Sequence, residues 1–238
     1  MRPTRVECAL ERSVAEDSRC PSALVIRRTA RMLSRRESMT FINVGSNKGY
    51  AIVDFLQRFH RTAPSKQGWL SSILNNGKVS EACGVCHACQ DPQATQRLWA
   101  KHVAVHAFDI YWPNVALLRA LLAAHNLSSI TTVHHAAVSN RSGSVFLRRR
   151  QGAGAGDEGV SAKLTRGGGF TTALPSVSLD NFTAAHAISR VSWLSVDAEG
   201  LDALVLEGVR ESPTANPNPK FPCCSLVRLP IAYWSLIG

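Results

Sequence analysis

The stretch Phe41–Tyr50, FINVGSNKGY, predicts a buried strand that turns through glycines directly into a helix. Asn43 is flanked by apolar residues. Two glycines four positions apart, Gly45 and Gly49, come next, and the segment AIVDFL then continues with helical spacing. Glycine allows close approach of the backbone to a ligand, and the free amides of a helix start are hydrogen-bond donors. In α/β folds such a turn cradles adenosine-type ligands, although Asn43 stands where this kind of strand usually ends in an acid.

Strands and helices alternate over residues 40–208, which indicates an α/β fold with a mostly parallel sheet and helices on both faces. The expected strands are 40–44, 102–108, 131–135 and 191–196, with short extra strands at 145–147 and 174–178. The expected helices are 50–59, a segment opening at Pro113, 179–188 and 201–208. Prolines at 213, 217, 219 and 222 disfavour further strands, so we expect the sheet to be incomplete at its C-terminal edge.

Two terminal segments flank this domain. Residues 1–38 form a basic leader, partly helical or disordered, and residues 211–238 an atypical proline-containing tail. The domain between them, 39–210, carries a cysteine-rich insertion at about 61–101 that is marked by turn residues. The chain has a net charge of +10, yet no aromatic residues interleave with the basic ones, which argues against a nucleic-acid platform. No apolar run reaches the length of a membrane span. We expect a cytoplasmic protein, or an organellar one if the leader directs import.

The insertion contains three of the seven cysteines, Cys83, Cys86 and Cys89. An odd count in a chain of this size is not a disulfide framework and fits a reducing compartment. Three closely spaced thiolates can hold a structural zinc ion, provided that a fourth ligand, such as His87 or His102, completes the site. The alternative is a compact loop with free thiols.

Two further strand ends carry acids. Asp109 follows the strand at 102–108, and Asp197 follows the strand at 191–196. Ligands of open parallel sheets bind at the carboxyl ends of strands, so Asp109 is placed to accept hydrogen bonds from ribose hydroxyls. Its distance from the glycine turn, without the 61–101 insertion, is about the 20 residues usual in dinucleotide folds. The alternative is that Asp109 is only a loop or helix-capping acid. The turn itself is neither G-x-G-x-x-G nor a phosphate loop, which favours a ligand without a pyrophosphate.

Four segments in order along residues 40–208 resemble the FkbM-type S-adenosylmethionine-dependent methyltransferases. They are Phe41–Tyr50, Val105–Asp109 with Pro113-Asn114, Ala136–Ser139 with Gly143, and Leu194–Gly200 continued by Val205–Gly208. The resemblance implies a Rossmann-like methyltransferase fold. It also implies methylation of a hydroxyl on a sugar or another small molecule, with S-adenosylmethionine as cofactor. The family usually has Asp where Asn43 stands.

The resemblance also implies roles for individual residues. Gly45, Asn47 and Gly49, after Asn43, would form the loop around the methionine part of the cofactor. Asp109 would hold the ribose, and Ala136 and Ala137 would lie near the adenine. Asp197 and Glu199 would sit beside the sulfonium and the acceptor, with Asp197 as first candidate for the base and Glu199 as second. The alternative for this pair is that Glu199-Gly200 merely caps the following helix.

A second function is open. Asn43 and the expected lack of final strands motivate the alternative of a truncated or degenerate domain that binds cofactor without catalysis. A basic, zinc-containing nucleic-acid binder would rest on charge and three cysteines alone. Binding of S-adenosylmethionine separates the first two hypotheses from the third, and turnover separates the first from the second.

Overall fold

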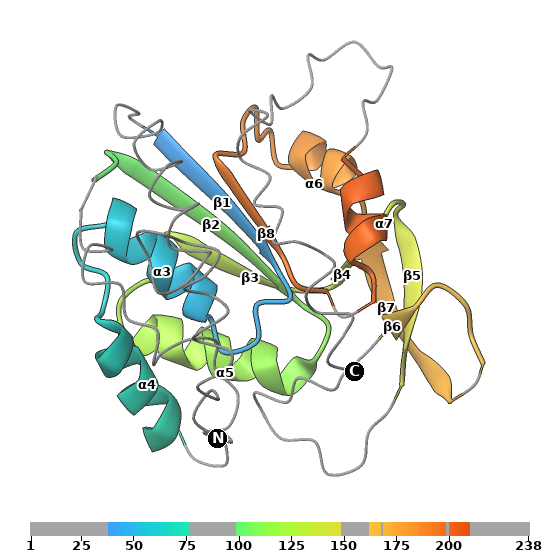
Figure 1. Cartoon of the computed structure of the whole chain (residues 1–238), viewed down its shortest axis with the longest axis horizontal. Coiled ribbons are helices and arrows are strands. Elements are labelled where there is room, and N and C mark those ends of the chain that lie inside the picture. The colour runs from blue at the N-terminus through green and yellow to red at the C-terminus, as the bar shows by residue number, and fades with distance from the viewer. Residues whose placement is uncertain (1–37, 77–98, 149–161, 168, 199, 210–238) are drawn as a thin grey trace, which may run out of the picture.

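The main sheet is built from four parallel strands in the order β3-β2-β1-β8 (Figure 1). They are β1 (Ser38–Val44), β2 (His102–Asp109), β3 (Thr131–His135) and β8 (Trp193–Val196). The computed structural model describes residues 38–76, 99–148, 162–167, 169–198 and 200–209. Apolar side chains fill both faces of β1, as expected for an inner strand covered on both sides. In register, Val44 of β1 lies beside Phe108 of β2 and Val196 of β8, so the carboxyl ends of these strands coincide.

Three helices cover one face of this sheet: α3 (Tyr50–Phe59), α4 (Lys66–Asn75) and α5 (Trp112–Ala124) (Figure 1). Their largest buried side chains include Phe55, Phe59, Trp69 and Leu118, which pack with one face of β1 and β2. Helix α4 lies inside the 61–101 insertion and was not predicted, because Gly68, Ser71 and Ser72 interrupt its apolar pattern.

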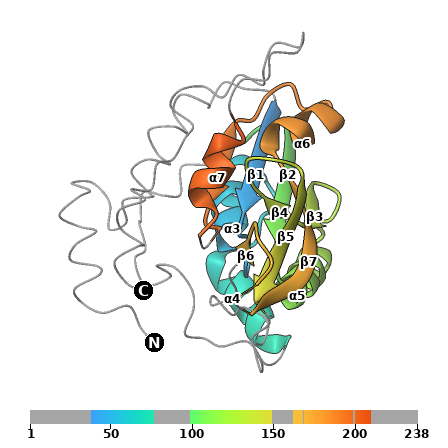
Figure 2. The ribbon, with the colours of Figure 1, turned by 90° about the vertical axis from the view of Figure 1, so that its right-hand side faces the viewer.

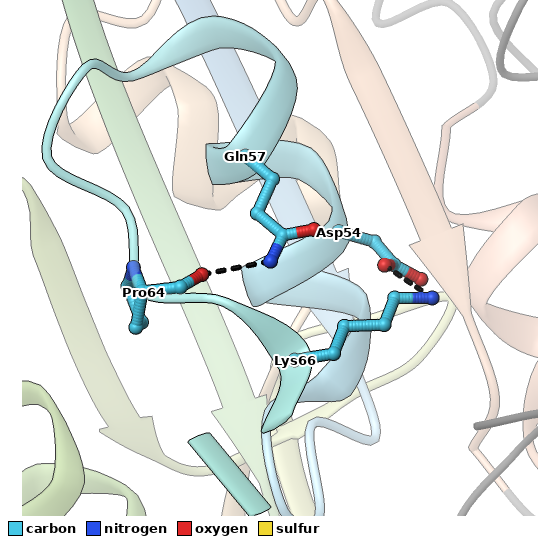
Figure 3. Close-up of polar contacts among 4 residues, drawn as sticks. All are labelled: Asp54, Gln57, Pro64 and Lys66. Atoms are coloured by element: carbon cyan, nitrogen blue, oxygen red, sulfur yellow. Dashed lines mark hydrogen bonds and ion pairs between the residues drawn. The ribbon is translucent and has the colours of Figure 1, made fainter. Parts of the chain in front are cut away.

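Polar contacts join α4 to α3 (Figure 3). Lys66 Nζ lies 2.7 Å from Asp54 Oδ1, and Gln57 Nε2 donates to the Pro64 carbonyl at 2.8 Å. The Ser65 hydroxyl caps the start of α4 by accepting from Gly68 N at 3.0 Å. These contacts hold α4 against the domain and thereby place Trp69 under the glycine turn.

Two shorter helices, α6 (Leu179–Ala185) and α7 (Asp202–Glu207), belong to the opposite face. Phe182 of α6 and Val205 of α7 pack with Ile42, Val44 and Phe108 of the sheet. The predicted α/β fold with helices on both faces is therefore confirmed.

A second, smaller sheet has the strand order β4-β7-β5-β6 (Figure 2). Its strands are β4 (Ala137–Val138), β5 (Gly143–Arg148), β6 (Ala162–Lys163) and β7 (Phe170–Val177). Its core reaches Ile110 after β2 and Ala198 after β8, so it flanks the carboxyl ends of the main strands. The sequence predicted the short strands of β5 and β7 but not that they would pair with each other.

Among the described residues, no strand pairs with the outer edge of β8. Residues 1–37 of the predicted leader, the cysteine cluster and the predicted tail lie outside the described residues, whereas Ser38 begins β1. Of the helices within the described ranges, none has both the length and the apolar character needed to cross a membrane.

Candidate functional site

The turn after β1 is held by the backbone of β2. The amides of Gly45 and Ser46 both donate to the Phe108 carbonyl, at 2.9 and 3.0 Å. The Ser46 hydroxyl donates to the Asn43 carbonyl at 3.1 Å, and Gly49 N donates to the Ser46 carbonyl at 2.7 Å. The turn is therefore closed upon itself as well as tied to the neighbouring strand.

Gly45 lies against the backbone at the end of β8. It adopts a φ of +76°, and a Cβ at this position would overlap the Asp197 carbonyl oxygen and lie 2.6 Å from its carbon. Asp197 N in turn donates to the Val44 carbonyl at 2.9 Å. Only glycine allows β1 and β8 to approach so closely, and this approach brings the glycine turn to Asp197.

Asp109 fastens the turn from the other side. Its Oδ2 accepts from Asn47 N at 2.7 Å, and its Oδ1 accepts from Tyr111 N at 2.8 Å. The Asn114 side-chain amide lies 3.4 Å from both oxygens. Asp109 is only 5% exposed, and the burial of its carboxyl group raises its pKa. The hydrogen bonds to the carboxyl group and the nearby His135 act in the opposite direction and lower this pKa. Asp109 thus stabilises the turn in addition to any role toward a ligand.

Two side-chain oxygens in the turn have no protein donor. Asn43 Oδ1 and Asn47 Oδ1 are enclosed and accept no hydrogen bond from the described residues. Asn47 adopts a φ of +43°, a conformation that asparagine tolerates better than most residues. Buried acceptors are normally satisfied, so this pair favours a ligand that brings N–H or O–H donors.

The start of α3 rests on Trp69. Trp69 Nε1 donates to the carbonyl of the buried Lys48 at 2.7 Å. Gly49 has a φ of +79°, and a Cβ there would lie 2.7 Å from Leu118 Cδ1 and 3.1 Å from the Trp69 ring. Trp69 is a positioning residue that the sequence did not identify, since it lies 21 residues from Lys48 in an unpredicted helix.

Asp197 is an exposed residue directly after β8. The turn that follows is anchored by Asp202, whose Oδ1 accepts from Ala198 N at 2.8 Å and whose Oδ2 accepts from Gly200 N at 3.4 Å. Glu199, the second predicted base, lies between these residues but outside the described set. Asp202 was also missed, although an acid in the first turn of a helix is a recognised anchoring pattern.

Near the end of β3, Ala137 is buried in a core, whereas His135 contacts the segment after β2. Ala137 is buried in the core of the second sheet, so its side chain faces Val145 and Leu174 rather than an opening. His135 Nε2 donates to the Ile110 carbonyl at 3.2 Å, and its ring lies 5.3 Å from that of Trp112. Trp112 is 53% exposed and begins α5, three residues after Asp109 in the sequence.

The structure brings together four of the predicted site residues: Gly45 contacts Asp197, and Asn47 donates to Asp109. Trp112 and His135, which the sequence did not single out, follow β2 and end β3 next to this group.

The cysteine cluster, Cys83, Cys86 and Cys89, lies outside the described residues. Within the described ranges, no group of three or more His, Cys, Asp or Glu side chains is arranged to hold a metal ion. A structural zinc ion stays a prediction from the sequence alone.

Comparison with known proteins yields one match. A family model, the methyltransferase FkbM domain, matches residues 77–223. This range contains β2 to α7, with both Asp109 and Asp197, and begins after the glycine turn. Searches of curated proteins and of solved structures returned no match.

Proposed function

Because the chain belongs to the FkbM methyltransferase family, we propose that it transfers the methyl group of S-adenosylmethionine to a hydroxyl of a sugar or another small molecule. The family match over more than half of the chain carries this proposal. The α/β architecture of the chain is the Rossmann-like methyltransferase fold. The glycine turn, Asp109 and Asp197 lie at the carboxyl end of its parallel strands, where such folds bind ligands.

The residues of the turn fit the cofactor. An amino-acid ammonium is a hydrogen-bond donor, and the enclosed oxygens of Asn43 and Asn47 are acceptors without a donor among the described residues. Asp109 has two good hydrogen bonds from the backbone, while a carboxylate offers about four acceptor positions. It therefore keeps capacity for a ribose hydroxyl. Ala136 and Ala137 would lie near the adenine through their backbone, since the side chain of Ala137 is buried in a core.

The cofactor, when bound, supplies a methyl group on a positively charged sulfur, which is already an activated leaving group. The protein then needs to orient the acceptor hydroxyl and to accept its proton. Asp197 is our candidate for this base, because it is exposed and its backbone is fixed against Gly45. Glu199 is the second candidate by its place in the sequence.

Cofactor binding is tested by calorimetric titration of the purified full chain with S-adenosylmethionine. We expect saturable binding, and we expect Asn43→Asp to tighten it by about tenfold, because a carboxylate pairs with an ammonium more strongly than an amide does. Asn140→Asp is the matched control, since Asn140 Oδ1 is likewise enclosed with no donor in the described part of the chain, while its amide nitrogen donates to Glu207. Absence of binding by both the parent chain and Asn43→Asp at millimolar ligand contradicts the proposal.

Turnover is tested separately, with a panel of sugars and other hydroxyl compounds and a methyl-labelled cofactor. Asp197→Asn should keep cofactor affinity and lower the rate by about 10²–10⁴-fold, the usual contribution of a general base. Cofactor binding by the parent chain without transfer to any acceptor would favour the degenerate domain. Asn43 and the unpaired edge of β8 in the described part of the chain are the observations on that side.

A further inference from the structure

A cavity lies at the opposite end of the main sheet from the glycine turn. It has a volume of about 560 Å³ and is lined by residues from the amino-terminal parts of β1 and β2, from the segment before β8 and from the end of α6. Its described lining consists of Ser38, Thr40, Ala104, His106, His186, Ala187, Ile188, Ser189, Arg190 and Ser192. Cavities of this size hold small-molecule ligands. Nothing in the proposed methyl transfer uses it.

The lining is basic and rich in hydroxyl groups. It contains one guanidinium, two imidazoles and several serine or threonine side chains, and no carboxylate occurs among its described residues. Arg190 Nε is enclosed yet makes no hydrogen bond within the described part of the chain. An enclosed N–H of a charged group without an acceptor is unfavourable, so the cavity favours a ligand with acceptor oxygens and negative charge.

The histidines provide adaptable donors. His186 Nδ1 lies 3.0 Å from the Phe182 carbonyl, which can only accept, so Nδ1 carries the hydrogen. Nε2 accepts in the neutral ring and donates only in the protonated ring. His106 Nδ1 lies 3.4 Å from His134 Nε2, and the His106 and His186 rings are 6.0 Å apart. The titratable and charged groups that face this cluster are His134 on β3, Arg119 on α5 and Arg190 in the loop before β8.

Burial favours the neutral form of His106 and of the neighbouring His134. Burial lowers the pKa of His106, and the neighbouring His186 lowers it further. Burial lowers the pKa of His134 to about 4, with His106, His186 and Arg119 contributing in the same direction. A bound anion would oppose this effect and favour proton uptake at the cluster.

The end of α6 does not offset this preference for an anion. Its carbonyls would repel negative charge if they were open to the cavity. Instead, Ile188 N donates to the Thr183 carbonyl at 2.8 Å and Ala187 N to the Ala184 carbonyl at 3.2 Å. Ala187 adopts a φ of +50° in this closing turn. The carbonyls of Thr183 and Ala184 are thus occupied by the backbone that follows them.

We propose that this cavity binds the tetrahedral anionic group of a phosphate or sulfate ester, with Arg190 as the fixed positive charge, His106 as a hydrogen-bond donor and His186 as a donor in its protonated form. The hydroxyls of Ser38 and Thr40 add neutral donors from β1. The cavity is larger than a free ion requires, so the ligand is an ester of a small molecule rather than the ion alone. The site is independent of the cofactor site and does not rest on the proposed methyl transfer.

Calorimetric titration of the full chain tests the proposal, with phenyl phosphate, phenyl sulfate and inorganic sulfate as probes. We expect saturable binding of at least one ester, tighter than that of inorganic sulfate, and the two esters show which anionic group is preferred. Sulfate keeps its charge of −2 between pH 7.5 and 5.5, so its affinity reports only on the protein. This affinity should rise severalfold as the pH falls over that range, because a bound anion favours protonation of His106, whose pKa is lowered by burial.

Arg190→Gln should weaken ester binding by at least about tenfold, because it removes a charged hydrogen-bond donor. Arg190→Lys, which keeps the charge, should retain part of the affinity. Arg141→Gln is the matched control, since Arg141 is an exposed arginine outside the cavity lining. The proposal is overturned if no ester binds saturably, if folded Arg190→Gln binds like the parent chain, or if sulfate affinity does not change with pH.

Discussion

Substitution of Gly45 by alanine should destabilise the protein far more than the same substitution at Gly49. Both glycines have almost the same backbone conformation, with φ of +76° and +79°. An alanine pays about 1–2 kcal/mol for this left-handed geometry at either position. The difference between them lies in what the new methyl group meets.

At Gly45 the methyl group would meet the fixed backbone of Asp197, 2.6 Å from its carbonyl carbon. Two carbon atoms prefer about 3.5–4.0 Å, so β1 and β8 must separate locally by about 1 Å. This movement stretches the hydrogen bonds from Asp197 N to Val44 and from Gly45 N to Phe108, at about 1 kcal/mol each. The total is about 3–4 kcal/mol. At Gly49 the nearest atom is the end of the flexible Leu118 side chain, which can turn away.

Urea denaturation of both variants, followed by tryptophan fluorescence, measures this difference directly. We expect Gly45→Ala to lose about 2 kcal/mol more free energy of unfolding than Gly49→Ala. Calorimetry with S-adenosylmethionine should show the greater loss of affinity for Gly45→Ala as well. Equal stabilities of the two variants would refute the close approach of β1 and β8 as the reason for glycine at position 45.

Three further predictions concern residues beneath the glycine turn, beside the cavity and in the core. Trp69→Phe should lower the free energy of unfolding by about 2 kcal/mol in urea denaturation, because it leaves the buried Lys48 carbonyl without its donor. Ala187→Gly should raise it by about 1 kcal/mol, since glycine adopts the left-handed end of α6 without strain, and a lower melting temperature would contradict this. The pKa of His134 is lowered to about 4, below its unfolded value of about 6.5. Between these two pH values the unfolded chain binds more protons than the folded chain, so the free energy of unfolding falls as the pH drops through this range. His134→Phe, which preserves the stacking on Phe108, should make melting temperature fall less between pH 7 and 5 than in the parent chain.

The sequence predicted the elements whose side chains repeat with a clear local period. The strands β1, β2 and β3 and the helix α3 were found in this way, because their apolar residues are buried by the same local pattern. Helix α4 was missed, since only Trp69 and Ile73 of its ten residues are buried and its serines resemble a loop. Its stability comes from packing against α3 and α5, which no local pattern records.

The candidate site shows the same division. The strand-end positions of Asp109 and Asp197 followed from the alternation of strands and helices. The hydrogen bond that Asp109 accepts from Asn47 N in the turn did not, since it joins residues 62 positions apart. Trp69, Asp202 and His135 hold the surrounding backbone through contacts that depend on the completed fold.

The hydrogen bond from Asn47 N to Asp109 has a consequence for the energetics of ligand binding. The turn is already ordered in the absence of a ligand, by this bond and by the two bonds to Phe108. The conformational entropy of ordering a loop is therefore lost on folding rather than on association, which leaves more of the contact energy for affinity. Such preorganisation also means that association requires little rearrangement of the backbone, so the rate of capture should be set by diffusion and orientation rather than by loop closure.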